Sequence, residues 1–131
     1  MILTKPLRLA CLCVGVLGLL PAARAGQADE SRVNFDRDIR PILSNNCFKC
    51  HGPDEKQRQA GLRLDTREGA FAERSGYRIL APGDPAASRL FQKISATDKA
   101  VRMPPEYSGR KLTEPQIDRI RQWIDEGARW E

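Results

Sequence analysis

Residues 47–51 read Cys-Phe-Lys-Cys-His, and this stretch decides which fold and which chemistry we expect. Cys-x-x-Cys-His is the pattern through which a c-type haem is attached to a polypeptide. The two thiols are spaced to add to the two vinyl groups of one porphyrin, and the adjacent imidazole then provides an axial ligand to the iron. Because His51 is the single histidine in the chain, it is the only candidate for that ligand. The motif predicts one haem held covalently by Cys47 and Cys50.

A second axial ligand is expected from the stretch Arg102-Met103-Pro104-Pro105. The other methionine, Met1, belongs to the N-terminal leader described below, so Met103 is the one methionine of the expected mature chain. A thioether is a soft ligand suited to iron, and Met/His ligation raises the potential of a haem. The proline after Met103 favours extended backbone, which keeps this residue out of a helix. The alternative is a Met103 that packs near the haem without binding the iron.

Three other uses of the two cysteines need weighing. A thioredoxin-like dithiol normally follows a strand of a βαβ unit, whereas a helical pattern precedes Cys47. A zinc site commonly has four protein ligands, and the expected mature chain offers only two cysteines and one adjacent histidine. A motif without function is the third alternative. An export signal, a single histidine and a single mature methionine together favour haem.

The first 25 residues have the features of a secretory signal peptide. Lys5 and Arg8 form a positive n-region, residues 9–20 are apolar, and Ala23-Arg24-Ala25 is a small-x-small cleavage site. The apolar stretch is shorter than the roughly 20 residues that span a membrane. We therefore expect cleavage after Ala25, export to a periplasm or equivalent compartment, and no membrane span in the mature chain.

Two alternatives to cleavage are an uncleaved membrane anchor and a lipoprotein acylated at Cys11 or Cys13. Cleavage would remove both of these cysteines, and the two that remain are too few for a disulfide framework.

Cleavage would also lower the formal net charge from +5 to +2, because residues 1–25 hold three basic residues and no acidic one. So small a charge, without lysine runs or interleaved aromatics, argues against a nucleic-acid partner.

Three segments of the remaining chain carry helical patterns, at residues 35–45, at residues 85–94 and between Thr113 and Gly127. Each follows a residue suited to cap a helix, and the third also has the Thr-x-x-Gln pattern of a capping box. Pro41 is expected to kink the first helix or to end it early, and Trp123 is expected to pack in the core rather than to relay electrons. The expected N-caps are Asn34, Asp84 and Thr113.

The segments between these helices are rich in glycine, proline and charge. Residues 52–83 and 95–112 are therefore expected to be loops, with one helical turn after Thr66 and a brief extended segment at residues 62–64. Loops of this length are uncommon in a compact domain unless something fills the space beside them. A bound haem would fill it.

An ordered set of motifs resembles the planctomycete-type cytochrome c domain, over nearly all of residues 33–130. The haem motif alone is common to all c-type cytochromes, whereas the ordered set is far more specific. The matching stretches are Val33-Asn34-Phe35-Asp36-Arg37-Asp38-Ile39-Arg40-Pro41-Ile42-Leu43, Cys47 to Pro53, Gly61 to Asp65, Pro82 to Pro85, Ser88 to Leu90, Arg102 to Pro105, Leu112-Thr113 and Trp123 to Ala128.

The resemblance implies an all-α, cytochrome c-like domain at residues 34–131, after a flexible segment at residues 26–33. About three main helices, the first packed on the last, and long loops would enclose one covalently bound haem c. Cys47 and Cys50 would be the thioether attachments, His51 the proximal ligand and Met103 the distal ligand. Such domains often begin much longer chains, so we expect either a stand-alone carrier or a truncated copy of a larger protein.

The expected function is transport of single electrons between a donor and an acceptor protein. A larger dehydrogenase or multidomain protein is a candidate for one of these redox partners. No catalytic dyad is evident in the sequence, so we do not expect an enzyme. The alternatives are a haem enzyme or ligand sensor with a displaceable sixth ligand, and a docking module of a larger complex. Four arginines are expected at the solvated surface, with one or two of them as candidate partners of the haem propionates. They are Arg63, Arg67, Arg102 and Arg110.

Overall fold

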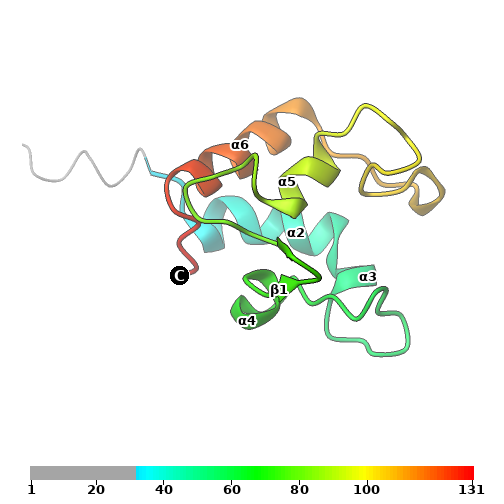
Figure 1. Cartoon of the computed structure of the whole chain (residues 1–131). Helices are drawn as coiled ribbons and strands as arrows, with labels where there is room; N and C mark the ends of the chain where they lie inside the picture. Colours follow the sequence, from blue (N-terminus) through cyan, green and yellow to red (C-terminus); the bar gives the residue numbers. More distant parts are fainter. Residues whose placement is uncertain (1–31) are drawn as a thin grey trace, which may run out of the picture.

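The computed structural model describes residues 32–131 (Figure 1). The expected signal peptide at residues 1–25, and residues 26–31 of the expected flexible segment, lie outside the described residues. Between residues 32 and 131, no helix is both long enough and apolar enough to cross a membrane.

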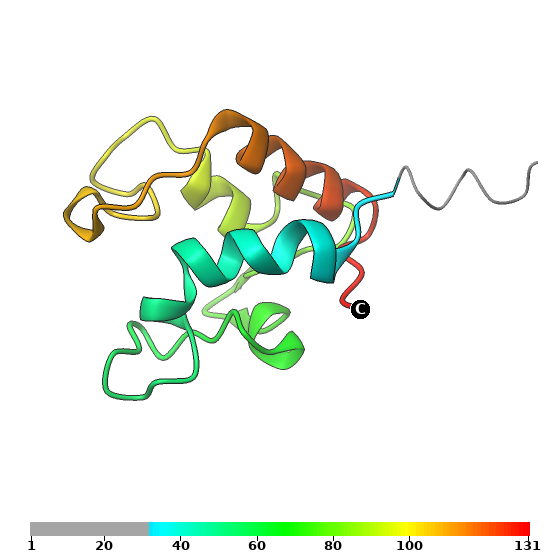
Figure 2. The same ribbon diagram turned by 180° about the vertical axis from the view of Figure 1, so that it is seen from behind.

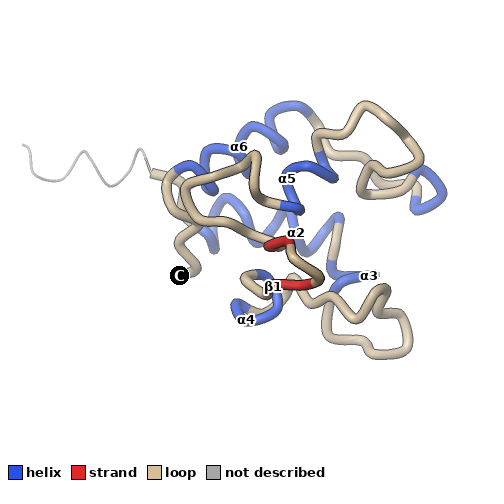
Figure 3. The backbone as a smooth tube through the Cα atoms, in the orientation of Figure 1, coloured by secondary structure: helices blue, strands red, loops and turns tan. Residues whose placement is uncertain are grey.

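Most of the regular structure is helical, which agrees with the expected class, and long loops join the helices (Figure 3). The sequence did not predict the small antiparallel hairpin, in which β1 pairs with β2. In chain order the elements are the π-helix η1 (Phe35–Ile39), α2 (Arg40–Asn46), α3 (Phe48–His51), α4 (Arg67–Ala70), β1 (Glu73–Arg74), β2 (Tyr77–Arg78), α5 (Arg89–Ile94), the 3-10 helix η2 (Glu106–Ser108) and α6 (Glu114–Asp125).

The first helix begins where the sequence predicts it, but its first turn is wider than that of an α-helix. The side-chain oxygen of Asn34 accepts a hydrogen bond from the backbone N–H of Arg37 at 2.8 Å, which caps the helix. The backbone N–H of Arg40 donates to the carbonyl of Phe35, five residues earlier. Pro41 has no N–H to donate, so the α-helical pairing is interrupted next to it. The expected irregularity at Pro41 takes the form of this π-helical turn.

The first and last helices pack together at the centre of the core, as the resemblance implies (Figures 1 and 2). The Phe35 ring stacks on Trp130 with 3.9 Å between centroids and lies 5.6 Å from Trp123. The backbone N–H of Val33 donates to the Glu126 carboxylate at 2.9 Å, which ties the two ends of the domain together. Trp123 is 1% exposed, so its expected place in the core is confirmed.

The capping box at the start of α6 is confirmed. The Thr113 hydroxyl accepts from the backbone N–H of Gln116, and the Gln116 side chain accepts from the backbone N–H of Thr113 at 3.0 Å. Gly127 follows the helix with a φ of +98°, a left-handed conformation that glycine adopts without strain. Local sequence signals therefore fix both ends of this helix.

The second helix begins at Arg89, later than the predicted start at residue 85. Asp84 caps only a turn, by accepting from the backbone N–H of Ala87 at 2.9 Å. The reason for the delay is Ser88, which is fully buried and extended. Its hydroxyl accepts from the backbone N–H of Ala81 at 2.8 Å and donates to the carbonyl of Asp84 at 2.8 Å. These bonds to the preceding loop hold Ser88 outside the helix.

Replacing Ser88 with alanine is expected to destabilise the domain by about 1–3 kcal/mol. The substitution leaves the buried N–H of Ala81 without its acceptor, and an unpaired buried donor carries the full cost of its desolvation. Urea unfolding of the purified protein measures the change. Ser44→Ala is the matched control, because the exposed Ser44 hydroxyl bonds only to a nearby carbonyl, and we expect a change within about 0.5 kcal/mol. Equal effects of the two substitutions would contradict the prediction.

The loop at residues 52–83 is partly as predicted. The helical turn after Thr66 is confirmed as α4, with the Thr66 side chain accepting from the backbone N–H of Gly69 at 3.2 Å. At residues 62–64, where the sequence permits a brief extended segment, no strand forms. Instead, the backbone N–H of Leu64 donates to the carbonyl of His51 at 2.8 Å. The backbone of this loop therefore hydrogen-bonds to the Cys-x-x-Cys-His motif and not to a strand.

Candidate functional site

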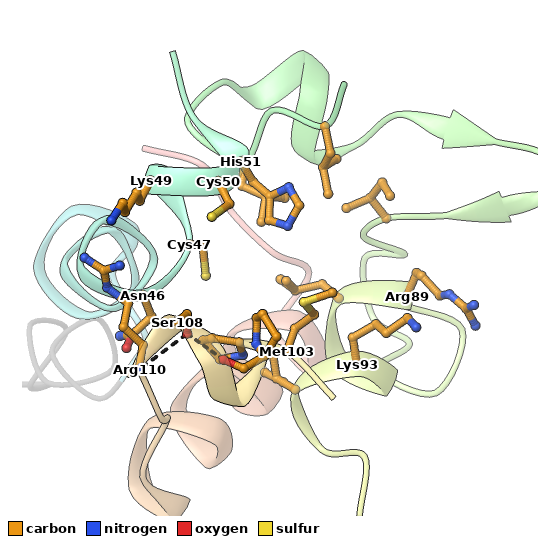
Figure 4. A pocket seen from close by; sticks show the side chains of 17 residues that line it. Asn46, Cys47, Lys49, Cys50, His51, Arg89, Lys93, Met103, Ser108 and Arg110 are labelled. Atoms are coloured by element: carbon orange, nitrogen blue, oxygen red, sulfur yellow. Dashed lines mark hydrogen bonds between the residues drawn. The ribbon is translucent and has the colours of Figure 1, made fainter. Parts of the chain in front are cut away.

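A pocket lies between the C-terminal end of the first helix, α5 and the loop that contains η2 (Figure 4). The pocket is partly open to solvent. Cys47, Cys50, His51 and Met103 all line this pocket. Apolar side chains also line it, namely Leu62, Leu64, Ile79, Leu90 and Ile94.

The Cys-x-x-Cys-His motif forms one wall of the pocket, where the chain turns from α2 into α3. The backbone N–H groups of Cys50 and His51 both bond to the carbonyl of Cys47, at 3.1 and 2.8 Å. This turn presents both thiols and the imidazole toward the pocket (Figure 4). Gly52 is required after it, because a Cβ there would lie 2.2 Å from the carbonyl oxygen of Phe48. The two cysteines are free thiols.

Met103 lies on the wall opposite His51, with its side chain pointing into the pocket (Figure 4). Its backbone N–H donates to the carbonyl of Lys93 at 3.0 Å, which fixes this loop position to the end of α5. The side chain is 37% exposed, which is unusual for methionine. The structure thus brings together the four residues that the sequence singles out, although they come from segments more than 50 residues apart.

Residues 47–107 match the family model described as Planctomycete cytochrome C. The match identifies a planctomycete-type cytochrome c domain over these residues. Comparisons with curated proteins and with solved structures found no match. The matched stretch starts at Cys47 and contains both His51 and Met103, so the match covers the predicted site residues that line the pocket. Membership of a cytochrome c family implies that this domain binds haem.

The chemistry of His51 in this cytochrome c domain fits an iron ligand. Its Nδ1 atom is buried and has no hydrogen-bond partner among residues 32–131. Burial lowers the pKa of the imidazole, and the backbone of Gln59 acts weakly in the opposite direction. The ring is therefore neutral near pH 7 and keeps the lone pair that metal binding requires. A buried polar atom without a partner points to a group that the pocket is built to receive.

The Cys47 thiol is protonated at neutral pH. Burial raises its pKa to about 12, and the nearby charge of Arg110 only partly opposes this effect. A thiolate is the form that binds zinc or attacks a disulfide, so the surroundings of Cys47 do not favour either use. A thioether carries no charge, and its formation in this apolar wall has no such penalty.

The geometry gives no support to the alternatives of zinc and a dithiol. Over residues 32–131 there is no group of three or more His, Cys, Asp or Glu side chains placed to hold a metal ion. A haem iron needs no such cluster of side chains, because the porphyrin supplies most of its ligands. The motif also follows α2 rather than a strand, and the two short strands of this part of the chain are antiparallel, unlike those of a βαβ unit.

Of the four candidate arginines, only Arg110 lines the pocket. Arg63 pairs with Asp65, Arg67 lies over the ring of Phe71, and Arg102 lies 3.6 Å from Glu106. Sequence reasoning missed three further cations in the pocket wall, Lys49, Arg89 and Lys93. Arg89 and Lys93 are four residues apart in a helix. This spacing is the one sequence signal that predicts both side chains on the same helix face.

Proposed function

We propose that this domain holds one haem covalently and carries single electrons between redox proteins in an exported compartment. The observation that carries the proposal is the convergence of Cys47, Cys50 and His51 on one pocket wall, with Met103 on the wall opposite. The bound haem supplies reversible one-electron chemistry at its iron, and the polypeptide supplies ligands, orientation and surroundings.

Each residue in the pocket has a distinct proposed role. Cys47 and Cys50 would hold the haem through thioether bonds to its two vinyl groups, each formed by addition of the S–H across the double bond with no leaving group. His51 and Met103 would bind the iron, each from its own wall of the pocket. The apolar side chains exclude water from the site, which lowers the local dielectric and helps to set the potential.

The backbone supports these roles by fixing the two ligand-bearing segments independently. His51 is held through its own N–H, bonded to Cys47, and its carbonyl, bonded to Leu64. Met103 is held through its N–H to Lys93. Ligands fixed from two separate segments need little rearrangement when the iron changes oxidation state, a property that suits an electron carrier.

Export rests on the sequence features of residues 1–25. The docking partners of the proposed carrier are an electron donor and an electron acceptor, one of which could be a larger dehydrogenase or multidomain protein. A module of a larger redox complex is compatible with the same pocket and the same haem.

A second candidate function is a ligand sensor or haem enzyme in which Met103 leaves the iron. One observation favours it. Met103 lines both the pocket and a second, partly open cavity, which is lined by the loop after α5 and the start of α6. That cavity would give the loop space to move and an external ligand space to approach.

The test is expression of the full chain in an exporting host that has the haem-attachment machinery. We expect haem stain to remain on the polypeptide in a denaturing gel, because thioether bonds survive unfolding. We also expect reversible, one-electron oxidation and reduction in a potentiometric titration. Loss of colour on denaturation would overturn covalent attachment, and irreversible redox behaviour would overturn the carrier role.

A further inference from the structure

The charges in the pocket wall are all of one sign. Lys49, Arg89, Lys93 and Arg110 line the pocket, and no Asp or Glu among residues 32–131 does so. None of these four side chains forms an ion pair with a carboxylate of the described residues. Four unpaired cations around an otherwise apolar pocket indicate that its occupant brings negative charge.

The four cations lie at two opposite edges of the pocket (Figure 4). Lys49 and Arg110 lie on the side of Cys47, and Arg110 is fixed there by a 2.7 Å hydrogen bond from its Nε to the carbonyl of Asn45. Its charge also acts directly on the Cys47 thiol. Arg89 and Lys93 lie on the far side, beyond the gap between His51 and Met103.

Arg89 and Lys93 are held as a pair by α5. They are four residues apart, so both side chains leave the same face of the helix. The Arg89 guanidinium lies 5.3 Å from the centre of the Tyr77 ring and donates to the Gln92 side chain at 3.1 Å. These neutral contacts orient the guanidinium but leave its charge without a carboxylate partner.

We propose that Arg89 and Lys93 receive the two propionates of the haem, an inference that rests on the proposed function. A porphyrin of this type carries its vinyl groups on one half of the ring and its propionates on the other half. Bonds from the vinyl groups to Cys47 and Cys50 turn the propionate half toward the opposite edge of the pocket. That edge is where Arg89 and Lys93 lie, and a partly buried carboxylate needs such a cation.

This assignment replaces the four arginines that the sequence suggested. Arg110 lines the pocket but lies at the cysteine edge, and Arg63 and Arg102 already have acidic neighbours. The assignment also links two functions of α5. The same Lys93 whose carbonyl holds Met103 would anchor a propionate through its side chain.

The measurable consequence is a redox-linked titration. An ionised propionate stabilises ferric iron, so reduction is accompanied by proton uptake and the midpoint potential falls with rising pH across the propionate titration. Losing a cationic partner makes the propionate hold its proton more tightly. Its pKa should then rise by about one pH unit, the lower end of the range for close opposite charges, because Arg89 is exposed. The other titratable side chains in the pocket wall are Cys47, Cys50, His51, Lys49 and Arg110.

The experiment measures midpoint potential against pH for haem-loaded full-length Arg89→Gln and Lys93→Gln. The expected result is a pH-dependent region displaced upward by about one pH unit in both variants. Arg110→Gln and Lys49→Gln are the matched controls at the cysteine edge, and they should leave the pH of this region in place. Arg89→Lys keeps the charge and should retain the wild-type profile.

The possible outcomes separate this inference from the proposed function. A wild-type chain without covalent haem overturns both. A wild-type chain with covalent haem, but with equal profiles for the α5 variants and the controls, overturns only the assignment of Arg89 and Lys93. Should Arg89→Gln fail to accumulate, Lys93→Gln and Arg89→Lys still decide the assignment through the same profile.

Discussion

Replacing both Cys47 and Cys50 with alanine is expected to remove all haem colour from the denatured polypeptide. The proposed attachment has two thioether bonds and no other covalent link, so their loss leaves only ligation by His51 and Met103, which unfolding abolishes. The measurement is haem stain on a denaturing gel, compared with total protein stain. Wild-type colour on the double variant would contradict the proposed role of the two cysteines.

The single variants provide the controls for this prediction. Cys47→Ala and Cys50→Ala each retain one thiol, so each should keep some colour through a single thioether. In those single variants one vinyl group stays unreacted, which should move the ferrous absorption bands to longer wavelength. A single variant that behaves as the double variant does would show that one of the cysteines carries the whole attachment.

The sequence predicted best those features that depend on near neighbours in the chain. The capping box at Thr113 and the cap at Asn34 are local hydrogen bonds within one helical turn, so residue type and spacing suffice to predict them. The close packing of the two end helices followed from the family resemblance, and its basis in the Phe35 and Trp130 stack became visible only in the structure.

The errors occurred where specific hydrogen bonds, which no helix or strand periodicity predicts, decide the local conformation. Asp84 and Pro85 have the composition of a helix start, yet the bonds of the Ser88 hydroxyl to Ala81 and Asp84 delay the helix. The two-residue strands β1 and β2 are too short to show an alternating pattern.

The candidate site shows the same division. Cys47, Cys50 and His51 are adjacent in the sequence, and their chemistry could be predicted from the motif alone. Met103 was predicted because it is the single methionine of the expected mature chain, and not because its position in the fold was known. The cations at the far edge of the pocket were missed, because only the folded chain places α5 opposite the cysteines. The sequence shows the charges of Arg89 and Lys93 but not the side of the pocket that they face.

Replacing Met103 with alanine should remove the weak far-red absorption of the ferric protein that arises from an iron–sulfur bond. It should also lower the midpoint potential, because a thioether stabilises ferrous iron relative to the harder ligands that would take its place. Covalent haem should be retained, since Cys47 and Cys50 are intact. The measurements are the ferric absorption spectrum and a potentiometric titration.

Val101→Ala is the control for this variant, because Val101 is exposed in the same loop and does not line the pocket. Its spectrum and potential should match those of the wild type. An unchanged spectrum in Met103→Ala would show that the sulfur is not a ligand. A wild-type protein that lacks the far-red band and binds cyanide as readily as Met103→Ala would favour the sensor or enzyme. Conversely, cyanide binding that is slow in the wild type and fast in Met103→Ala would show that the methionine closes the iron to external ligands, as an electron carrier requires.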